Sequence, residues 1–186
     1  MNLPVDPSLA LPFPTPDEMA QHETFMRVAL REAARGEEKG DIPVGAVIVH
    51  QGKIIGKAHN QRELLQDPTA HAEILAITQA ASALGSWRLL DTVLYVTLEP
   101  CAMCAGAIVL ARIPLLVIGA RDPKTGACGS LFNIVQDDRL NHRVKLVPEV
   151  LQAECSEMLS AFFRAKRKPG AGPALPGTRP VPPLPL

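Results

Sequence analysis

The sequence lacks three features that would place it in particular classes of protein. No apolar run approaches the length of about 20 residues that a membrane-spanning helix needs. No basic segment followed by an apolar one precedes the rest of the chain, so no secretory signal is visible. The net charge is zero, with 19 basic and 19 acidic residues. We therefore expect a cytoplasmic protein without membrane contacts, in which any nucleic-acid binding comes from a local basic patch.

Proline is common at the two ends of the chain and cysteine is scarce throughout. Five of the 18 prolines lie in residues 1–16 and seven in residues 169–186. We therefore expect disordered tails at 1–15 and 169–186, on either side of a single domain at 16–168. The four cysteines belong to a chain with a large core and no visible signal peptide, which favours thiolate or metal chemistry over disulfides.

Hydrophobic periodicity and turn residues predict an alternation of strands and helices. Thr15 and Glu18 form a capping box before an amphipathic stripe. Helices are predicted at 16–36, 70–84, 101–111 and 149–167, and strands at 43–50, 53–59, 92–98, 115–119 and 144–147. Residues 131–136 are ambiguous between a short helix and a strand. Alternation after residue 92 implies parallel strands, so we expect a three-layer α/β/α sandwich with a mixed sheet of about five strands.

Two short stretches carry a metal-site pattern. Cys101 and Cys104 are three residues apart at a predicted helix start, and His71 lies thirty residues upstream. These three ligands leave one tetrahedral position open, which is the catalytic rather than the structural arrangement of zinc. Glu73 suits the role of a nearby base. Its two-residue spacing from His71 is awkward on a regular helix, and we expect Thr69 as N-cap to bring both side chains to the helix entrance.

Other readings of these residues carry less weight. A Cys-x-x-Cys pair alone is compatible with a redox site, but that site would not explain His71 and Glu73. Cys128 could complete a closed structural zinc site, although it lies in a Gly-rich loop without a partner at ligand spacing. Cys155 is most simply a buried thiol, and His22 more simply a packed side chain than a ligand.

The motifs resemble a known family. His71-Ala-Glu73 followed by Pro100-Cys-Ala-Met-Cys104 is similar to the signature of the zinc-dependent nucleobase deaminases, the cytidine deaminase-like superfamily. Further segments narrow the resemblance to the bacterial tRNA adenosine deaminases: 67–73, 94–107, 119–126, 141–144 and 162–164. It extends over about residues 17–168, which is the whole predicted domain.

The resemblance implies a reaction and a set of roles. It implies hydrolytic deamination of adenosine to inosine at the wobble position of a tRNA anticodon stem-loop, in an arginine tRNA, by zinc-activated water. His71, Cys101 and Cys104 would hold one Zn²⁺ per subunit, and Glu73 would carry the protons. A homodimer is also implied, for which the apolar helix at 102–111 offers an interface.

Substrate-binding roles follow for further residues. By resemblance Asn60 binds the flipped nucleoside and Asp122 lies beside the preceding sugar, where a carboxylate favours RNA. The alternative for Asp122 is a turn residue before Pro123. Backbone N–H groups near Ala72 and Cys101 could hold the base. The basic cluster containing Arg164 and Lys166 is the best candidate for phosphate contacts, the alternative being a solubilising end of the helix.

Two rival functions remain open. The first is a deaminase of free nucleobases or nucleosides, acting on guanine or cytosine, which would have no use for the basic cluster. The second is a zinc module that binds RNA without chemistry. An assay on tRNA and free bases distinguishes the first rival, and a Glu73→Ala variant distinguishes the second.

Overall fold

The computed structural model describes residues 14–167. In chain order the elements are α1 (Pro16–Glu38), β1 (Gly45–His50), β2 (Lys53–His59), α2 (Arg62–Leu65), α3 (Ala72–Leu84), β3 (Thr92–Leu98), α4 (Ala102–Leu110), β4 (Leu115–Ala120), β5 (Lys145–Val147) and α5 (Gln152–Arg167). The tails predicted at 1–15 and 169–186 lie outside the described residues, apart from Pro14 and Thr15. Every helix and strand predicted from the sequence is present, with ends that differ by a few residues.

The five strands form one mixed sheet in the order β2-β1-β3-β4-β5. β1 pairs antiparallel with β2 and with β3, whereas β4 pairs parallel with β3 and with β5. The carboxyl ends of β3 and β4 therefore lie at the same edge of the sheet, where ligand sites of α/β folds gather. This edge brings the residues after Leu98 next to the loop that follows Ala120, because Leu98 pairs with Ala120.

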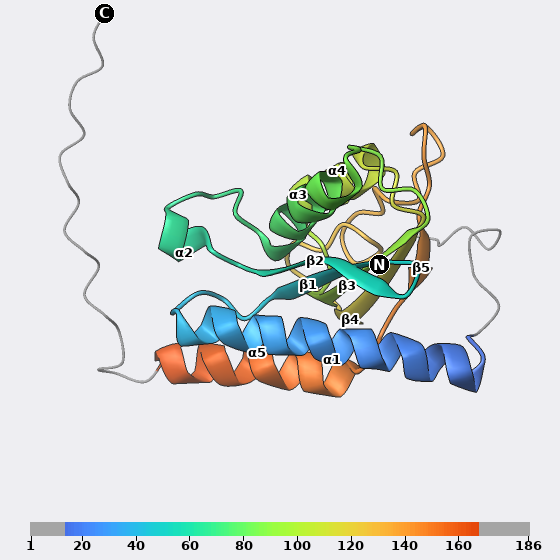
Figure 1. Cartoon of the computed structure of the whole chain (residues 1–186). Coiled ribbons are helices and arrows are strands. Elements are labelled where there is room, and N and C mark those ends of the chain that lie inside the picture. The colour runs from blue at the N-terminus through green and yellow to red at the C-terminus, as the bar shows by residue number, and fades with distance from the viewer. Residues whose placement is uncertain (1–13, 168–186) are drawn as a thin grey trace, which may run out of the picture.

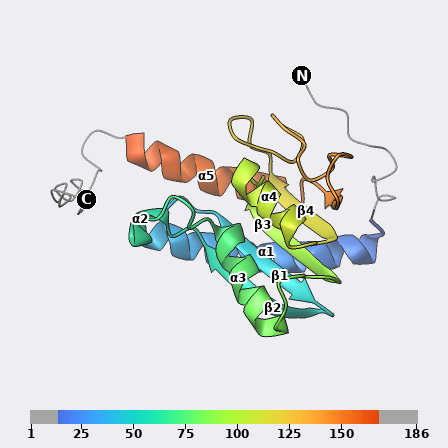
Figure 2. The same ribbon diagram turned by 90° about the horizontal axis from the view of Figure 1, so that it is seen from above.

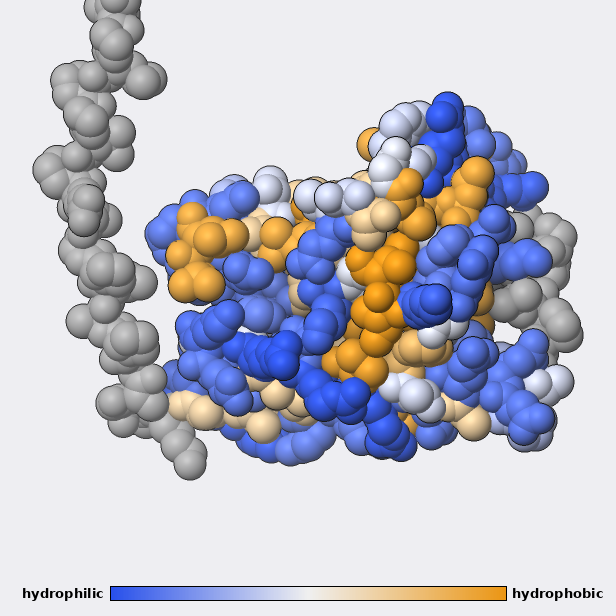
Figure 3. All heavy atoms as spheres, viewed as in Figure 1, coloured by the Kyte–Doolittle hydropathy of each residue, from blue (hydrophilic) through white to orange (hydrophobic). Residues whose placement is uncertain are grey.

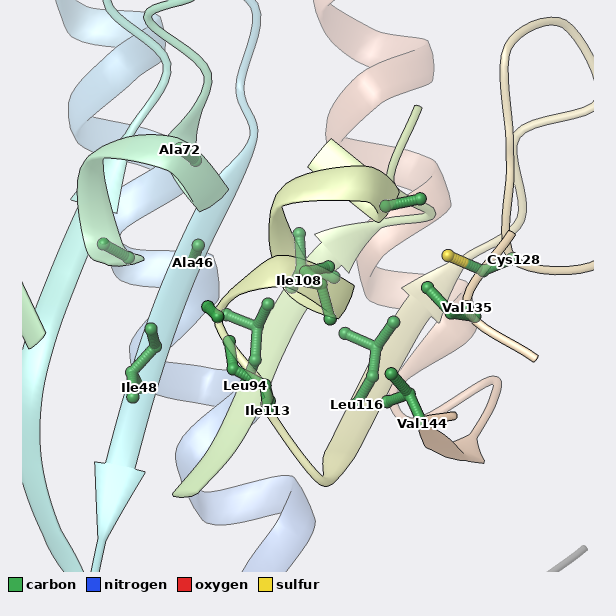
Figure 4. Packing of buried hydrophobic residues seen from close by; sticks show 14 of the residues in the cluster. Ala46, Ile48, Ala72, Leu94, Ile108, Ile113, Leu116, Cys128, Val135 and Val144 are labelled. Atoms are coloured by element: carbon green, nitrogen blue, oxygen red, sulfur yellow. The ribbon is translucent and has the colours of Figure 1, made fainter. Parts of the chain in front are cut away.

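Helices cover both faces of the sheet. Figures 1 and 2 show α1 and α5 against one face and α3 and α4 against the other. Neighbouring residues of each central strand face opposite layers, as the pleat requires. The core under α3 and α4 contains Ile48, Leu94, Ile108 and Leu116 (Figure 4), and the core under α1 and α5 contains Met26, Val47, Tyr95 and Val117. The predicted three-layer sandwich is confirmed.

Local chemistry fixes the position of α1. The predicted capping box is present, because the Thr15 side chain accepts from the Glu18 N–H and the Glu18 carboxylate accepts from the Thr15 N–H. At its other contact the helix approaches β1 so closely that only glycine fits. A Cβ on Gly45 would collide with the Ala29 carbonyl oxygen and lie 2.7 Å from the Ala33 nitrogen.

Three segments differ from the sequence-based expectation. α2 was not predicted; Asp41 caps it from another segment by accepting from the Glu63 and Leu64 N–H groups. Residues 131–136 form neither a helix nor a strand, only an isolated bridge between Cys128 and Asn133. The last helix begins at Gln152 rather than at 149, because the chain before it turns through positive φ angles.

The surface gives two further observations. Figure 3 shows hydrophobic atoms over α2, where the side chains of Leu64 and Leu65 are both exposed. Within residues 14–167, none of the helices combines the length and the apolar character that crossing a bilayer requires.

Candidate active site and metal centre

Two helices begin at the site, and each begins with a residue of the predicted ligand set. His71 is the N-cap of α3 and Cys101 is the N-cap of α4, both with extended backbone angles and neither with a side-chain capping bond. Their side chains are therefore free to bind something beyond the helix ends. Thr69 is not the N-cap, so that prediction was wrong; its hydroxyl and N–H both bond the Asp67 carboxylate.

The three predicted metal ligands lie together. The Nδ1 atom of His71 is 3.7 Å from Cys101 Sγ and 3.5 Å from Cys104 Sγ, and the three ligand atoms lie within 4.8 Å of one another. Zinc bonds of about 2.3 Å to sulfur and about 2.0 Å to nitrogen in tetrahedral geometry place sulfur and nitrogen about 3.5 Å apart. The donor set and its spacing therefore fit a zinc ion, and the group can hold a metal.

Position in the helices explains why these side chains converge. Cys101 and Cys104 occupy the N-cap and N3 positions of α4, which are the two positions that contact each other in a capping box. Hydrogen bonds from Cys104 and His71 lower the pKa of the Cys101 thiol to about 3, and the bond to Cys101 raises the pKa of Cys104. The partial positive charge at both helix starts further favours thiolate.

Glu73 lies in the first turn of α3 and is only 3% exposed. Burial raises the pKa of its carboxyl, although the neighbouring His71 opposes that shift. Its Oε2 atom is buried and makes no hydrogen bond with any described residue. On a regular helix, side chains two residues apart point about 200° away from each other. His71 precedes the regular helix, so this separation does not apply to His71 and Glu73. Glu73 lies beside the group of three ligands and is not a member of it.

A cavity of about 490 Å³ opens at this group. That volume lies within the range of about 300–1,000 Å³ typical of small-ligand pockets. Its lining residues come from six separate parts of the chain: Ile42, Val44, Asn60, Arg62, His71, Glu73, Leu98, Glu99, Cys101, Asp122, Pro123, Lys124, Thr125, Leu159, Ser160 and Phe163. Polar and charged side chains outnumber the apolar ones, and Phe163 adds an aromatic ring, so the cavity suits a planar heterocycle that carries hydrogen-bonding groups.

Asn60 follows β2 and reaches the start of α3. Its Oδ1 atom accepts a hydrogen bond of 2.9 Å from the Ala72 N–H, and the residue is 5% exposed. Asn60 thereby caps α3, because the side chain of the N-cap residue His71 belongs to the ligand group. The two residues predicted to bind the nucleoside are thus in contact, and in this structure the Ala72 N–H is already engaged by Asn60.

Asp122 lines the cavity at the start of the loop after β4. Its carboxylate also holds the local turn, accepting from the Lys124 N–H, the Thr125 N–H and the Thr125 hydroxyl. The turn alternative considered for this residue therefore describes real contacts, and these contacts leave Asp122 at the cavity wall.

Glu99 was given no role by the sequence analysis. It lies directly after β3, is 2% exposed and lines the cavity. Its two carboxylate oxygens accept hydrogen bonds from the backbone of Asp122, Cys128 and Ser130 and from the Ser130 hydroxyl. The only sequence signal was an acidic residue at the end of a buried strand, where it is neither a helix cap nor a metal ligand.

The basic cluster lies at the end of α5, which borders the cavity through Leu159 and Phe163. Arg164 pairs with Glu157 at 2.5 Å, and both side chains are exposed. Lys166 contacts the Gly40 carbonyl oxygen at 3.3 Å and lies 4.8 Å from the centre of the Phe162 ring. Neither cation is among the residues that line the cavity, and both side chains are exposed.

The remaining candidates take no part in the site. Cys128 is buried in the core beside Val135 (Figure 4), and it does not belong to the group of three ligands. Cys155 is buried in the other core cluster. His22 is buried and pairs with the Tyr95 hydroxyl at 3.0 Å, on the opposite face of the sheet.

Comparison with known proteins assigns the chain to a family. Residues 20–167 match the MafB19-like deaminase family. The tRNA-specific adenosine deaminase of Bacillus subtilis (strain 168) is 55% identical over 150 residues, which cover 81% of this chain and 93% of that protein. The chain belongs to the tRNA-specific adenosine deaminases.

Solved structures agree with this assignment. A structure from a study of A-to-I editing by tRNA:A34 deaminases at the wobble position of transfer RNA has a TM-score of 0.71 and 43% sequence identity. The match covers 73% of this chain and 99% of that one. A guanine deaminase from Bacillus subtilis has a TM-score of 0.52 at 45% identity, but the match covers only 54% of this chain and 64% of the other. The fuller match is thus with the tRNA deaminase.

Proposed function

We propose that this chain converts adenosine to inosine by hydrolytic deamination at the wobble position of a tRNA anticodon. The observation that carries the proposal is a group of three side chains that can hold a metal ion. It lies beside a buried carboxylate oxygen without a hydrogen-bond partner among residues 14–167, at the cavity of a chain in the tRNA-specific adenosine deaminase family. Deamination by water needs an activated oxygen nucleophile and a group that moves protons, and this arrangement can supply both.

The metal in the proposal is zinc, one ion per chain, held by His71, Cys101 and Cys104. The two sulfurs and one imidazole nitrogen are ligands that zinc prefers. When bound there, zinc supplies a Lewis acid that makes a water ligand more acidic.

Glu73 is the proposed proton carrier. Within the described part of the chain its buried Oε2 atom has no competing hydrogen bond, so this oxygen is available to accept a proton from the nucleophile. Burial raises the pKa of the carboxyl, which brings it closer to the pKa range in which one group can both accept and donate protons near neutral pH. Glu73 then delivers protons to the ring nitrogen and to the departing amine, so that adenosine and water become inosine and ammonia.

Substrate contacts surround this centre. Asn60 donates to the base while its Oδ1 atom accepts from Ala72, whose backbone lies at the positive start of α3. Asp122 contacts the sugar before the target nucleotide, and Arg164 and Lys166 contact phosphates. The exposure of both cations outside the cavity supports the last role, because a polynucleotide extends beyond the pocket that takes its base.

The substrate in the proposal is an arginine tRNA, and the location is the cytoplasm, where tRNA is used. The chain is proposed to act as a homodimer through α4. Met103 and Leu110 are exposed at i and i+7, with Gly106 between them facing open space. Leu131 and Phe132 are also exposed. Apolar side chains grouped on one helix face are typical of an interface.

A single substitution tests the dimer. Leu110→Arg places a charge on the α4 face and should yield a monomer in light scattering after size-exclusion chromatography. Leu90→Arg is the control, because Leu90 is similarly exposed but does not lie on α4. A Leu110→Arg protein that stays dimeric would show that the interface does not use α4.

Guanine deamination is the second candidate, because the guanine deaminase match reaches 45% identity over part of the chain. The deciding experiment incubates zinc-loaded protein with an arginine tRNA transcript carrying adenosine at the wobble position, and separately with guanine, cytidine and adenosine. Inosine at the wobble position supports the proposal. Turnover confined to the free bases or nucleosides would overturn it, and zinc binding without any turnover would favour an RNA-binding module.

A further inference from the structure

Glu99 is a buried carboxylate whose hydrogen bonds all lead to one loop. Its Oε1 atom accepts from the Cys128 N–H and the Ser130 N–H, each at 3.0 Å. Its Oε2 atom accepts from the Asp122 N–H at 3.1 Å and from the Ser130 hydroxyl. The carboxylate therefore holds both ends of the segment 122–130, which closes around it.

The loop fits closely around this side chain. A Cβ on Gly126 would lie 2.5 Å from Glu99 Cδ and 2.5 Å from the Asp122 carbonyl oxygen. The loop is also joined to the metal-binding segment, residues 100–104, because the Ala127 N–H donates to the Pro100 carbonyl oxygen at 2.8 Å. Glu99 itself stands two residues before Cys101. Glu99 therefore fixes the position of the loop relative to the metal-binding segment.

Residues 122–125 of the same loop form one wall of the cavity, the Asp122 wall. A shift of this wall would move the Asp122 side chain relative to His71 and Cys101 while leaving Glu73, on α3, unmoved. Hydrogen bonds to a charged acceptor are stronger than neutral ones, so the carboxylate restrains the loop more firmly than an amide would.

We propose that Glu99 is a positioning residue for substrate binding: it sets the distance between the Asp122 wall and the metal-binding segment, and so the affinity for RNA. This inference rests on the proposed function, because it assigns the Asp122 wall to an RNA substrate. Glu99 touches neither substrate nor metal in this role and acts through Asp122.

Glu99→Gln tests the proposal because its effect falls on one hydrogen bond. With the amide oxygen at the Oε1 position, the Cys128 and Ser130 N–H groups keep their acceptor. The amide nitrogen then takes the Oε2 position, where the Ser130 hydroxyl can rotate to accept from it. Only the Asp122 N–H loses its acceptor, because a backbone donor cannot reverse.

Backbone hydrogen exchange gives a readout that does not depend on activity. In zinc-loaded protein, Glu99→Gln should speed exchange of the Asp122 amide at least about tenfold, while the Cys128 amide keeps its protection. Ile48→Val is the control, since it removes one methylene from the core far from the loop. It should leave the ratio of the exchange rates of the Asp122 and Cys128 amides unchanged. An Asp122 amide that exchanges at the wild-type rate in Glu99→Gln would overturn the proposal.

Kinetics on the tRNA stem-loop complete the test through a double-mutant cycle with Asp122→Asn, which keeps the Oδ1 acceptor of the turn. Glu99→Gln should raise KM about tenfold with kcat within about twofold and zinc content unchanged. In the Asp122→Asn background the same change should have little further effect on KM, because the two residues act as a unit. Independent, multiplicative effects, or a fall in kcat at constant KM, would show a merely structural role. Wild-type protein without inosine formation would instead refute the proposed function itself.

Discussion

Replacing Asn60 by alanine or by aspartate separates two roles of this side chain. In Asn60→Ala the buried Ala72 N–H loses its acceptor at the start of α3. An unsatisfied buried donor costs about 1–3 kcal/mol, and each kcal/mol shifts the Tm of a domain of this size by about 2–4 °C. We therefore expect Tm to fall by about 2–12 °C. In Asn60→Asp an oxygen still accepts from Ala72, and a carboxylate is favoured at a helix start, so Tm should stay within about 2 °C of the wild type.

Activity should not follow stability in this pair. Both variants lack the amide donor proposed to bind the base, and losing such a bond costs about 1–3 kcal/mol, or about 5–150-fold in kcat/KM. The assay combines thermal unfolding, zinc content and inosine formation in a tRNA stem-loop. An aspartate variant as active as the wild type would refute the substrate role of Asn60. An aspartate variant as unstable as the alanine variant would refute its capping role.

Two more predictions concern the loop and the pH dependence. Gly126→Ala forces a Cβ against Glu99 and the Asp122 carbonyl oxygen. This overpacking should lower the free energy of unfolding by about 1–3 kcal/mol and raise KM for tRNA. A urea midpoint equal to that of the wild type would contradict the prediction. Burial lowers the pKa of His22 and His59, so below about pH 6.5 the unfolded chain binds more protons than the folded one. The free energy of unfolding should therefore fall as pH drops from about 6.5 toward the pKa values of the folded state. The fall should be smaller in His59→Gln. Equal pH profiles of the free energy of unfolding in variant and wild type would show that His59 does not contribute to it.

The fold could be predicted from the sequence because each layer leaves a local signal. The apolar strands at 92–98 and 115–119 and the capping box at Thr15 have the periodicity and the caps of the elements they form. α2 leaves no such signal, since it has only four residues and Asp41, some twenty residues away, caps it. Residues 131–136 form no regular element because the N–H groups of Leu131, Phe132 and Ile134 donate to the loop before them, which no local pattern indicates.

The centre of the site could be predicted because its chemistry needs particular residue types at particular spacings. His71, Cys101 and Cys104 are close in space as expected. The N-cap was misplaced at Thr69 because threonine is the usual N-cap residue, whereas here the N-cap side chain serves the ligand group. Glu99 could not be found, because its partners are backbone N–H groups whose direction depends on the folded loop.

Glu73 is proposed to move protons beside a zinc ion during the conversion of adenosine to inosine in tRNA. Single-turnover inosine formation at the wobble position tests this role, with wild-type and Glu73→Gln protein and with zinc measured in each sample. We expect equal zinc content and a rate that falls by about 10²–10⁴-fold in the variant, which is the contribution of general acid–base catalysis. A Glu73→Gln protein that forms inosine at the wild-type rate would contradict it.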